Sequence, residues 1–509
     1  MTEDQAPAGV KAAAGPALLG LAAAVVIVGL ATYRGQWFPA PWSSFSAPGL
    51  GSSRLAHWQA FGAYYGTLVV LGLAWMWMLK VVRAEPRFPA WVVLGVFVLW
   101  SIPFLVGPSV SSEDVYAYAG LGQLVERGLD PYESGVNALG RAPVVQVSPP
   151  FWRDNPSPYG PLYVRAAWLA SVATHDSVRG TVVVLRLFGI ACLLLLALPV
   201  SALARRSGTP PALALAAVLC SPIVLGELVG AAHNEPFMVV LLAAGVAIGL
   251  AGLDRRSGAR AGRVAPDRGV AVVATGVVLC GAAATVKVPG LLGAVLLGWL
   301  WAGSGTSVLR RLPGLIAATV LALAVVVVIS LGSGLGLGWV RALDEPQRAY
   351  TLLAPFTSLG IVLQQIFVHL GLPSGWVLPV LRPAGTMVGI GLAALLITRA
   401  DRLGGPLALG LALLVLAATT PAVWAWYMIW GFVFVATVAV PRSLQVAVVA
   451  LNLTLTPLGF GTLDVTRHPT ATAVLMTLVV FAAGAWTLGA IRDRQSGRAG
   501  IDLSQMTER

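Results

Sequence analysis

Long apolar runs separated by short polar segments form the dominant pattern of this 509-residue chain. Most runs approach the roughly 20 residues that an α-helix needs to cross the hydrocarbon core of a bilayer. The pattern predicts about fourteen membrane helices, with these expected ranges in chain order: 14–33, 58–80, 88–106, 181–203, 209–230, 236–253, 269–286, 288–303, 313–331, 376–398, 404–419, 424–440, 443–461 and 469–491. We therefore expect an all-α polytopic membrane protein in which residues 1–509 form a single integral membrane domain.

The composition agrees with a membrane protein, because 57% of the residues are hydrophobic and only 11% are charged. Soluble domains carry about 25% charged residues. The three cysteines, Cys192, Cys220 and Cys280, all fall inside apolar runs. They are typical of packing residues and indicate no disulfide framework.

The basic residues cluster in short segments between apolar runs, such as "KVVRAEPR" and "DRRSGARAGRVAPDR". This is the positive-inside pattern of cytoplasmic loops, so the net charge of +12 does not indicate a nucleic-acid partner. An even number of spans places both termini in the cytoplasm, together with the polar tail 492–509. The long segments 34–57, 107–180 and 332–375 then lie outside. The outer side holds 11 of the 21 acidic residues, and all five histidines fall outside or at outer helix ends. Because the titratable residues concentrate on the outer side, we expect an extracytoplasmic active site. The Arg-, Ala- and Gly-rich composition indicates a GC-rich bacterium, so we expect a multi-pass protein of the bacterial cell membrane.

The outer segment 107–180 contains the stretch "SSEDVYAYAG", which is polar and aromatic directly after an apolar run. The spacing of apolar residues over 115–129 predicts a short helix on the membrane surface. On that helix Asp114 and Tyr118 are four residues apart and share a face. Residues 161–174 are expected to form a second surface helix, and "GLDPY" and "NPSPYGP" predict turns.

Two interpretations fit the acidic pair Glu113 and Asp114. Acidic residues at a helix N-terminus suit the helix dipole, and Ser111 or Ser112 would cap the helix. Alternatively, a carboxylate at the outer surface is a general base that accepts the proton of a sugar hydroxyl as it attacks an activated sugar.

Five sequence blocks, in order over residues 90–435, resemble one enzyme family: "EDVYAYAGLGQLVERGLDPY", "SPYGPLY", "HNEPFM", "KVPG" and "PAVWAWYMIW". The family is that of the polyprenol-phosphate-mannose-dependent α-(1→6)-mannopyranosyltransferases of lipomannan and lipoglycan biosynthesis, which have the GT-C glycosyltransferase fold. An acidic pair in the outer loop after an early helix is a hallmark of this fold. The chain departs from the family pattern after "HN", where Glu235-Pro236 stands in place of an aspartate and a small residue.

The resemblance implies an integral membrane enzyme with surface helices and an active site on its outer face. Its donor would be polyprenyl-phosphate mannose, and its acceptor a hydroxyl group of a lipid-anchored mannan, both within the membrane lipids. By this resemblance Asp114 is the general base, with Glu113 as the alternative or helper. A single displacement would convert the β-linked donor into an α-(1→6)-linked product with inversion. The transition state would have oxocarbenium character, and no covalent enzyme intermediate is needed.

The phosphate that leaves in such a reaction needs positive charge or hydrogen-bond donors. Lys287 lies beside a helix break between two apolar runs, where a lysine is costly unless it is paired or hydrated. It is therefore a candidate for binding the donor phosphate, and a lysine snorkelling at a helix end is the alternative. His233, Asn234 and Glu235 at an outer helix junction are candidates for binding sugar or phosphate, with a polar helix cap as the alternative.

Other charged residues have structural explanations as well as functional ones. Arg341 and Arg348 are candidates to clamp phosphate bidentately, or to pair with the acidic residues that lie between them in the sequence. Arg186 and Glu227 fall within predicted membrane helices. An ion pair between these two is the structural solution that we favour for them.

Aromatic residues gather at a predicted outer membrane boundary. The segment "PAVWAWYMIW" is typical of the aromatic belt of membrane proteins. By the resemblance, the same segment lines the active site, where its rings contact sugar or prenyl chain. The candidate cavity aromatics are Tyr118, Tyr159, Trp424, Trp426 and Tyr427.

We expect no cofactor, because the chain contains neither a P-loop nor a dinucleotide-binding fingerprint. Glu113, Asp114 and His233 are the residues that would ligate a divalent metal, but no spacing requires one. Two alternatives stay open. A GT-C transferase of another prenyl-phosphate sugar, such as arabinose or glucose, would use the same residue types. A transporter or flippase of a lipid-linked sugar would also combine many helices with buried charges, although the chain shows no internal repeat and its charges concentrate outside.

Overall fold

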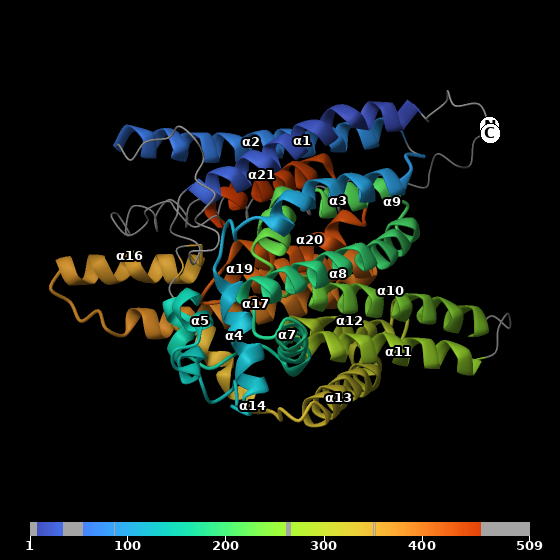
Figure 1. Ribbon diagram of the computed structural model, residues 1–509. Helices are drawn as coiled ribbons and strands as arrows, with labels where there is room; N and C mark the ends of the chain where they lie inside the picture. The colour runs from blue at the N-terminus through green and yellow to red at the C-terminus, as the bar shows by residue number, and fades with distance from the viewer. Residues whose placement is uncertain are drawn as a thin grey trace.

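The computed structural model describes residues 8–33, 54–85, 87–260, 266–349, 351 and 353–459. Their regular structure is entirely helical, with no strand among them (Figure 1). This confirms the predicted all-α fold. The helix expected over 469–491 and the polar tail expected over 492–509 lie outside the described residues.

The apolar helices occupy the ranges that the hydrophobic runs predict. The longer ones are α1 (Ala8–Tyr33), α2 (Arg54–Ala84), α3 (Ala90–Val106), α8 (Val178–Arg206), α10 (Glu235–Arg260), α11 (Pro266–Ala284), α13 (Val308–Gly332), α17 (Val377–Thr398) and α21 (Arg442–Gly459). The shorter ones are α9 (Pro211–Leu219), α12 (Leu291–Leu300), α19 (Gly405–Thr419) and α20 (Ile429–Ala436). Six of the described helices are long and apolar enough to cross a membrane, or seven if α9 and the bent segment after it form one span. The protein is therefore a multi-pass membrane protein, while the count of fourteen spans stays a prediction.

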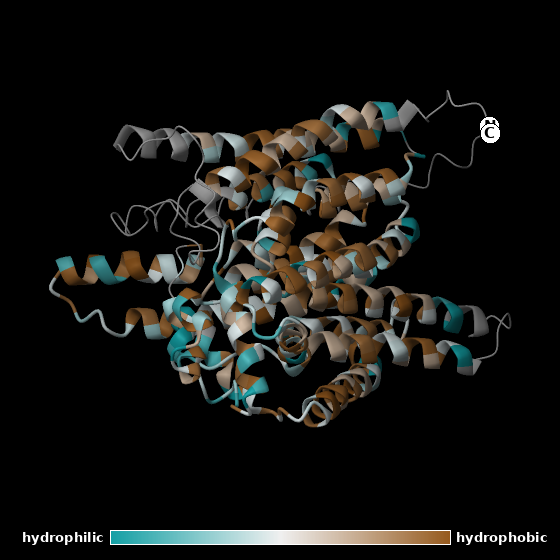
Figure 2. Ribbon diagram, in the orientation of Figure 1, coloured by the Kyte–Doolittle hydropathy of each residue, from teal (hydrophilic) through white to brown (hydrophobic). Residues whose placement is uncertain are grey.

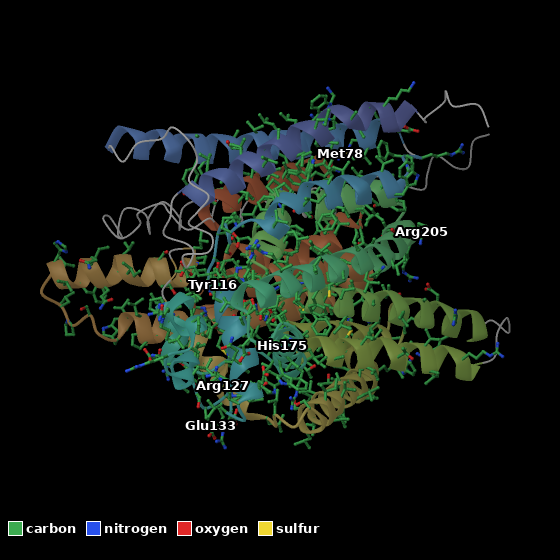
Figure 3. The ribbon with its side chains drawn as sticks, viewed as in Figure 1. Met78, Tyr116, Arg127, Glu133, His175 and Arg205 are labelled. Atoms are coloured by element: carbon green, nitrogen blue, oxygen red, sulfur yellow. The ribbon has the colours of Figure 1, made fainter. Side chains whose placement is uncertain are left out.

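Short helices gather at one end of the bundle, where α4, α5 and α14 lie together (Figure 1). Hydrophilic residues concentrate there and at the opposite tips of α10 and α11, whereas hydrophobic residues cover the long helices between (Figure 2). Arg127 and Glu133 mark the first end and Arg205 the other (Figure 3). The short helices are α4 (Asp114–Glu126), η1 (Val136–Leu139), α5 (Pro143–Val147), α6 (Pro150–Asp154), α7 (Pro161–Ala173), α14 (Gly338–Arg341), η4 (Ala342–Asp344), α15 (Glu345–Arg348) and α16 (Pro355–His369). A further short helix, α18 (Ala400–Leu403), lies instead beside Arg311, after the far end of α12.

Helix α4 corrects the prediction of a helix on the membrane surface. The helix forms over the expected residues, but the whole stretch from Val115 to Leu124 is buried. It packs against α7 and α8, and Gly122 lets it approach the backbone of Ala167 in α7 closely. The sequence "VYAYAGLG", residues 115–122, has no charged residue on any side, and a helix that is apolar all round is buried within protein. The second predicted surface helix, 161–174, is confirmed as a helix by α7.

Helix α16 lies in the segment 332–375, for which the hydrophobic pattern predicted no helix. Its 15 residues begin with Pro355 in the first turn, a position where the missing N–H of proline costs no helical hydrogen bond. The glycine-rich stretch before it also contains the short helices α14 and α15. This segment is therefore largely helical.

Interrupted helices expose the backbone that carries the polar motifs. Helix α9 and the π-helix η2 (Val224–Gly230) are bent by 64° at a break that contains Pro222, which cannot donate a backbone hydrogen bond. After η2, Ala232 adopts a positive φ of 54°, and α10 begins at Glu235. A second break separates α11 from the turn η3 (Val288–Gly290), and a third precedes α20 at η5 (Ala425–Met428). Irregular backbone at membrane depth is tolerated where it is buried in protein or lines a cavity.

Candidate active site

Asp114 is the first residue of α4 and lies at the edge of the site. The indole N–H of Trp152 donates a hydrogen bond of 3.0 Å to its Oδ1, and its backbone N–H donates to Ser112. Its Oδ2 lies 3.9 Å from Nδ1 of His233, and 16% of its side chain is exposed. Burial raises the pKa of Asp114 to about 6, although the Trp152 hydrogen bond and the charge of Lys287 oppose the rise. The carboxylate is therefore partly exposed, and its pKa lies above the usual value of an aspartate.

Glu113, the neighbouring carboxylate, has a different environment. It precedes α4 at the N-cap position, but its side chain makes no capping hydrogen bond. Burial raises its pKa, and the opposing charge comes from Arg153. The two carboxylates of the predicted pair thus face different partners, and Asp114 is the one directed toward His233.

His233 lies in the break between η2 and α10 and joins two tyrosines to the carboxylate. The hydroxyl of Tyr118 is 3.2 Å from Nδ1 of His233 and 3.3 Å from the hydroxyl of Tyr159. Burial lowers the pKa of His233 well below its usual value, and the charge of Lys287 adds to this effect. Burial also raises the pKa values of Tyr118 and Tyr159 well above 10. The group therefore presents neutral phenols and a neutral imidazole beside Asp114.

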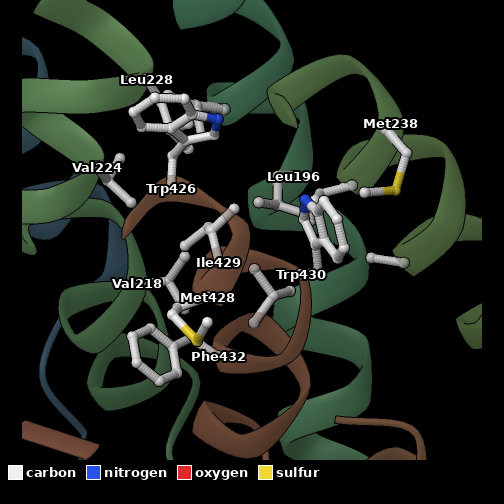
Figure 4. Packing of buried hydrophobic residues seen from close by; sticks show 14 of the residues in the cluster. Leu196, Val218, Val224, Leu228, Met238, Trp426, Met428, Ile429, Trp430 and Phe432 are labelled. Carbon is white, nitrogen blue, oxygen red and sulfur yellow. The ribbon is translucent and has the colours of Figure 1, made fainter. Parts of the chain in front are cut away.

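Tryptophans of η5 form a stacked wall behind the imidazole. Trp426 stacks on His233 with ring centroids 3.7 Å apart, and Trp424 stacks on Trp426 at 5.0 Å. Figure 4 shows Trp426 beside Leu228 and Val224 of η2. The segment before α20 thus anchors these rings in the hydrophobic core. The rings in turn support His233, which lies in the break after η2.

Lys287 lies at the start of η3 inside a cage of aromatic rings. Its Nζ is 4.6 Å from the ring centre of Tyr427 and 5.6 Å from those of Tyr159 and Trp430. The ammonium group forms a close ion pair with Glu235 and lies 3.4 Å from Oδ1 of Asn234. Its side chain is 15% exposed, so the cage is open on one side. Rings around a cation attract it by their electron-rich faces.

Several buried polar atoms of this cluster make no hydrogen bond within the described residues. They are Nδ2 of Asn234, Oε2 of Glu235, Nε2 of His233 and Oε1 of Glu227. Buried polar groups in native proteins are nearly always hydrogen-bonded, to protein or to water. Unpaired donors and acceptors beside a half-open cage are therefore available to a polar ligand.

The loop that carries Tyr159 is fixed to the Lys287 segment by backbone hydrogen bonds. The N–H of Gly160 donates to the carbonyl of Val286, and the N–H of Leu162 donates to that of Thr285. Each hydrogen bond is 3.2 Å long. A Cβ atom at Gly160 would overlap the Thr285 carbonyl, so only glycine permits this approach. The "SPYGPLY" and "KVPG" blocks, more than 100 residues apart in the sequence, thus form one side of the site.

The structure does not bring Arg341 and Arg348 into this cluster. Both are exposed on the short helices α14 and α15. Arg348 pairs with Glu345 at 3.1 Å, which agrees with the structural explanation given above. Their proposed contact with phosphate stays a prediction.

The expected ion pair between Arg186 and Glu227 is wrong. Arg186 is completely buried and donates instead to backbone carbonyls, including those of Gly107 at 2.6 Å and Gly230 at 3.1 Å. Helix ends leave such carbonyls without helical partners, and these carbonyls accept the hydrogen bonds that the guanidinium group donates. Glu227 accepts a hydrogen bond of 2.9 Å from Ser111 and lies 3.5 Å from Nε2 of His233.

Sequence reasoning missed Trp152 and gave Glu227 the wrong partner. Trp152 occurs in "FWRDNPSPYG", where an aromatic residue beside charged ones in an outer loop was the available signal. Among the described residues, no group of three His, Cys, Asp or Glu side chains is arranged to hold a metal ion. The absence of a metal requirement remains an expectation.

Comparison with known proteins assigns the chain to a family. Residues 17–303 match the N-terminal domain of the α-(1→6)-mannopyranosyltransferase family, and residues 356–488 match the MptB C-terminal domain. The chain is 29% identical over 410 residues to a probable α-(1→6)-mannopyranosyltransferase of Mycolicibacterium smegmatis, which covers 76% of this chain and 72% of that protein. It is 28% identical over 467 residues to an α-(1→6)-mannopyranosyltransferase of Mycobacterium tuberculosis, covering 81% and 78%. For α-(1→6)-mannopyranosyltransferase B of Corynebacterium glutamicum the identity is 29% over 371 residues, covering 70% and 60%. No solved structure matches the chain.

The first family match spans more than half of the chain and contains the motif blocks from "EDVYAYAG" to "KVPG". It also contains the carboxylate, the imidazole and the caged lysine described above. The resemblance seen in the sequence is therefore confirmed, and the chain belongs to the α-(1→6)-mannopyranosyltransferase family of GT-C membrane glycosyltransferases.

Proposed function

We propose that this membrane mannosyltransferase uses polyprenyl-phosphate mannose as its donor and a lipid-anchored mannan as its acceptor. It extends the acceptor by α-(1→6) links on the extracytoplasmic face. The names of the relatives support the sugar and the linkage. The motif resemblance supports the lipid donor and the acceptor. A prenyl-phosphate arabinose or glucose is the alternative donor, since no residue type in the site selects mannose.

The observation that carries the mechanism is the placement of Asp114 in one cluster with Lys287. Asp114 lies 3.9 Å from His233, and Tyr118 joins His233 to Tyr159. The ring centre of Tyr159 lies 5.6 Å from Nζ of Lys287. A general base works best when its pKa lies near the working pH, and that of Asp114 is about 6. Asp114 accepts the proton of the acceptor hydroxyl as its oxygen attacks the anomeric carbon. The bond from that carbon to the phosphate oxygen breaks on the opposite face, which inverts the configuration.

Lys287 takes the role of binding the phosphate that leaves. Its ammonium group is held by aromatic rings and Glu235, so it is positioned before the donor arrives. Preorganised charge in a site that excludes water stabilises a developing anion strongly. The free Nδ2 of Asn234 adds a hydrogen-bond donor beside the ammonium group.

The neutral residues between these charges hold the reactants. His233 and Tyr118 contact each other next to Asp114 and orient the acceptor hydroxyl toward the carboxylate. The stacked rings of Trp424 and Trp426 provide an apolar face for a sugar ring or prenyl chain. Holding the acceptor hydroxyl next to the donor sugar supplies much of the rate enhancement that a transferase without a cofactor needs.

The test is mannosyl transfer in membranes that contain equal amounts of wild type, Asp114→Asn or Glu113→Gln. With polyprenyl-phosphate mannose and a short α-(1→6)-mannoside, Asp114→Asn should reduce transfer by about a hundredfold or more. Glu113→Gln is the matched control and should retain most activity.

Each other outcome has a definite meaning. Loss of transfer in Glu113→Gln but not in Asp114→Asn would make Glu113 the base. Transfer by wild type from prenyl-phosphate arabinose or glucose, but not from the mannose donor, would overturn the sugar assignment.

A further inference from the structure

A second cavity lies at the end of the bundle opposite the candidate active site. It has a volume of about 460 Å³ and is lined by residues of α2, α9, α20 and α21 and by the turn 208–210. This turn follows Arg205, which marks that end of the molecule in Figure 3. Ligand pockets in proteins typically measure roughly 300–1,000 Å³, so this cavity is large enough for part of a lipid.

Most of the wall of the cavity is apolar. The apolar lining residues include Leu79, Leu213, Ile429, Phe432 and Val449, which come from four different helices. Such a surface suits a hydrocarbon chain, because burying it removes apolar area from water. An ion without an apolar part would gain nothing from these walls.

Two arginines provide positive charge at the cavity. Arg83 and Arg442 line it and are exposed. Arg83 donates a hydrogen bond of 2.8 Å to the side chain of Gln445, which donates at 2.8 Å to the carbonyl of Val440. Among the described residues, neither arginine has a carboxylate within ion-pair distance. This pair of guanidinium groups therefore has charge available for an anion, and phosphate is a group that arginine binds bidentately.

Two buried polar side chains of the lining are also unpartnered. Thr209 is 8% exposed and Asn452 is 2% exposed. The hydroxyl of Thr209 and Oδ1 of Asn452 find no hydrogen-bond partner in the described part of the chain. Thr209 belongs to the turn at the bundle end and can donate to a phosphate or ester oxygen. The polar lining thus favours a ligand with a polar head and an apolar tail.

We propose that this cavity is a binding site for an anionic membrane phospholipid. The phosphate lies between Arg83 and Arg442, and an acyl chain enters the cavity against Phe432 and Val449. Basic pockets between membrane helices on the cytoplasmic side are known to suit anionic lipid head groups. The positive-inside pattern assigns this end to that side.

The bound lipid would touch the helix that carries the aromatic wall of the active site. Ile429 and Phe432 line the cavity, while Trp426 and Trp430 of the same segment contact His233 and Lys287. Figure 4 shows Trp426, Ile429, Trp430 and Phe432 on one continuous stretch of chain. Occupation of the cavity therefore stabilises the segment on which the site is built. The proposal concerns binding and does not depend on which sugar is transferred.

The test uses the purified full chain in nanodiscs of phosphatidylcholine with increasing phosphatidylglycerol. Thermal unfolding and the amount of phosphatidylglycerol retained after extraction are measured for wild type, Arg83→Gln/Arg442→Gln and Arg205→Gln. Charge-assisted hydrogen bonds are the strong ones, so the double variant should bind phosphatidylglycerol about tenfold more weakly or worse. Arg205→Gln removes a charge at the same end of the bundle but outside the cavity lining, and should behave as wild type.

A second variant keeps the test decisive if the double variant fails to fold. Ala217→Phe places a ring in the cavity and should abolish lipid retention while both arginines remain. Equal retention by Arg83→Gln/Arg442→Gln and Arg205→Gln would overturn the proposal, as would equal stabilisation by phosphatidylcholine. Stabilisation by inorganic phosphate alone would indicate a simple anion site instead. Preferential retention of a polyprenyl phosphate would indicate a prenyl-lipid site instead.

Discussion

Two ion pairs lie near opposite ends of α12. They differ in how many of their polar atoms have hydrogen-bond partners. Arg311 pairs with Asp401 and also donates to the carbonyls of Trp299 and Gly303 at 3.2 and 3.0 Å. Lys287 pairs with Glu235, but one oxygen of that carboxylate has no partner among the described residues. Both cations lie over aromatic rings, so ring contact alone does not distinguish them.

The difference separates a structural pair from one that is available for chemistry. A pair whose hydrogen-bond groups are all used stabilises a turn and leaves no polar atom free for a ligand. The Arg311 pair joins the turns after α12 and α17 in this way. The Lys287 pair keeps free polar atoms and a partly exposed ammonium group beside Asp114.

Neutralising each cation should give the largest contrast. Lys287→Met should reduce mannosyl transfer per folded molecule by about a hundredfold or more, because the leaving phosphate loses its counter-charge. Arg311→Met should lower the free energy of unfolding by about 1–3 kcal/mol, since the carbonyls of Trp299 and Gly303 lose their hydrogen-bond donor. The surviving Arg311→Met protein should transfer within about twofold of wild type. Transfer is measured in membranes and normalised to folded protein by size-exclusion chromatography.

A double variant separates charge loss from misfolding at the Lys287 pair. Lys287→Met/Glu235→Gln removes the unpaired buried carboxylate and should recover stability without recovering transfer. Equal losses of transfer per folded molecule in Arg311→Met and Lys287→Met would contradict the distinction between the two pairs.

Hydrophobic patterning predicted most of the fold because a long apolar run has one main solution in a membrane. The run 181–203 appears as α8, Val178–Arg206, and 376–398 as α17, Val377–Thr398. Helix α16 escaped prediction because it has 15 residues and lies in a segment rich in glycine and charge. The burial of α4 was missed because periodicity shows that a helix forms but not what covers it.

The ring over Lys287 should give the next largest effect. Tyr427→Leu removes the nearest aromatic face and should weaken donor binding by about tenfold, since a desolvated cation–π contact contributes about 2 kcal/mol. Tyr427→Phe keeps the ring and should stay close to wild type. The measurement is the KM for polyprenyl-phosphate mannose at saturating acceptor. If the Phe and Leu variants lose activity equally, the hydroxyl and not the ring matters.

The hydrogen bond from Trp152 should have a smaller effect, confined to the acidic limb of the pH profile. A base must be deprotonated, so transfer should fall as the pH drops through about 6, the pKa of Asp114. The Trp152 hydrogen bond lowers this pKa. Trp152→Phe should therefore raise the pKa of Asp114 and shift the acidic limb of the profile to higher pH. We expect about a fivefold loss at pH 6 and little change at pH 8. The exposed Trp91 supplies the control variant Trp91→Phe, and an unshifted limb in Trp152→Phe would remove Asp114 as the titrating base.

The composition of the candidate site was predictable only as far as the motif blocks extend. They contain Asp114, His233, Glu235 and Lys287, which the fold brings together through breaks in different helices. Trp152 reaches Asp114 across 38 residues through the fold of an irregular loop, which no local pattern encodes. Arg186 has no acidic partner because helix-end carbonyls take its donors, and these appear only once the breaks are folded.

Arg341 and Arg348 should give the smallest effect and thereby mark the boundary of the site. The side chain of Arg348 is 65% exposed and already paired with Glu345, and exposed ion pairs contribute about 0–1 kcal/mol. Arg341→Gln and Arg348→Gln should each change the KM for the donor by less than about twofold. A tenfold rise in that KM for either variant would show that the segment containing α14 and α15 closes over the phosphate during the reaction. Arg341 or Arg348 would then bind the donor phosphate together with Lys287. In that case the contrast between the Lys287 and Arg311 pairs would apply only to the site before the donor binds.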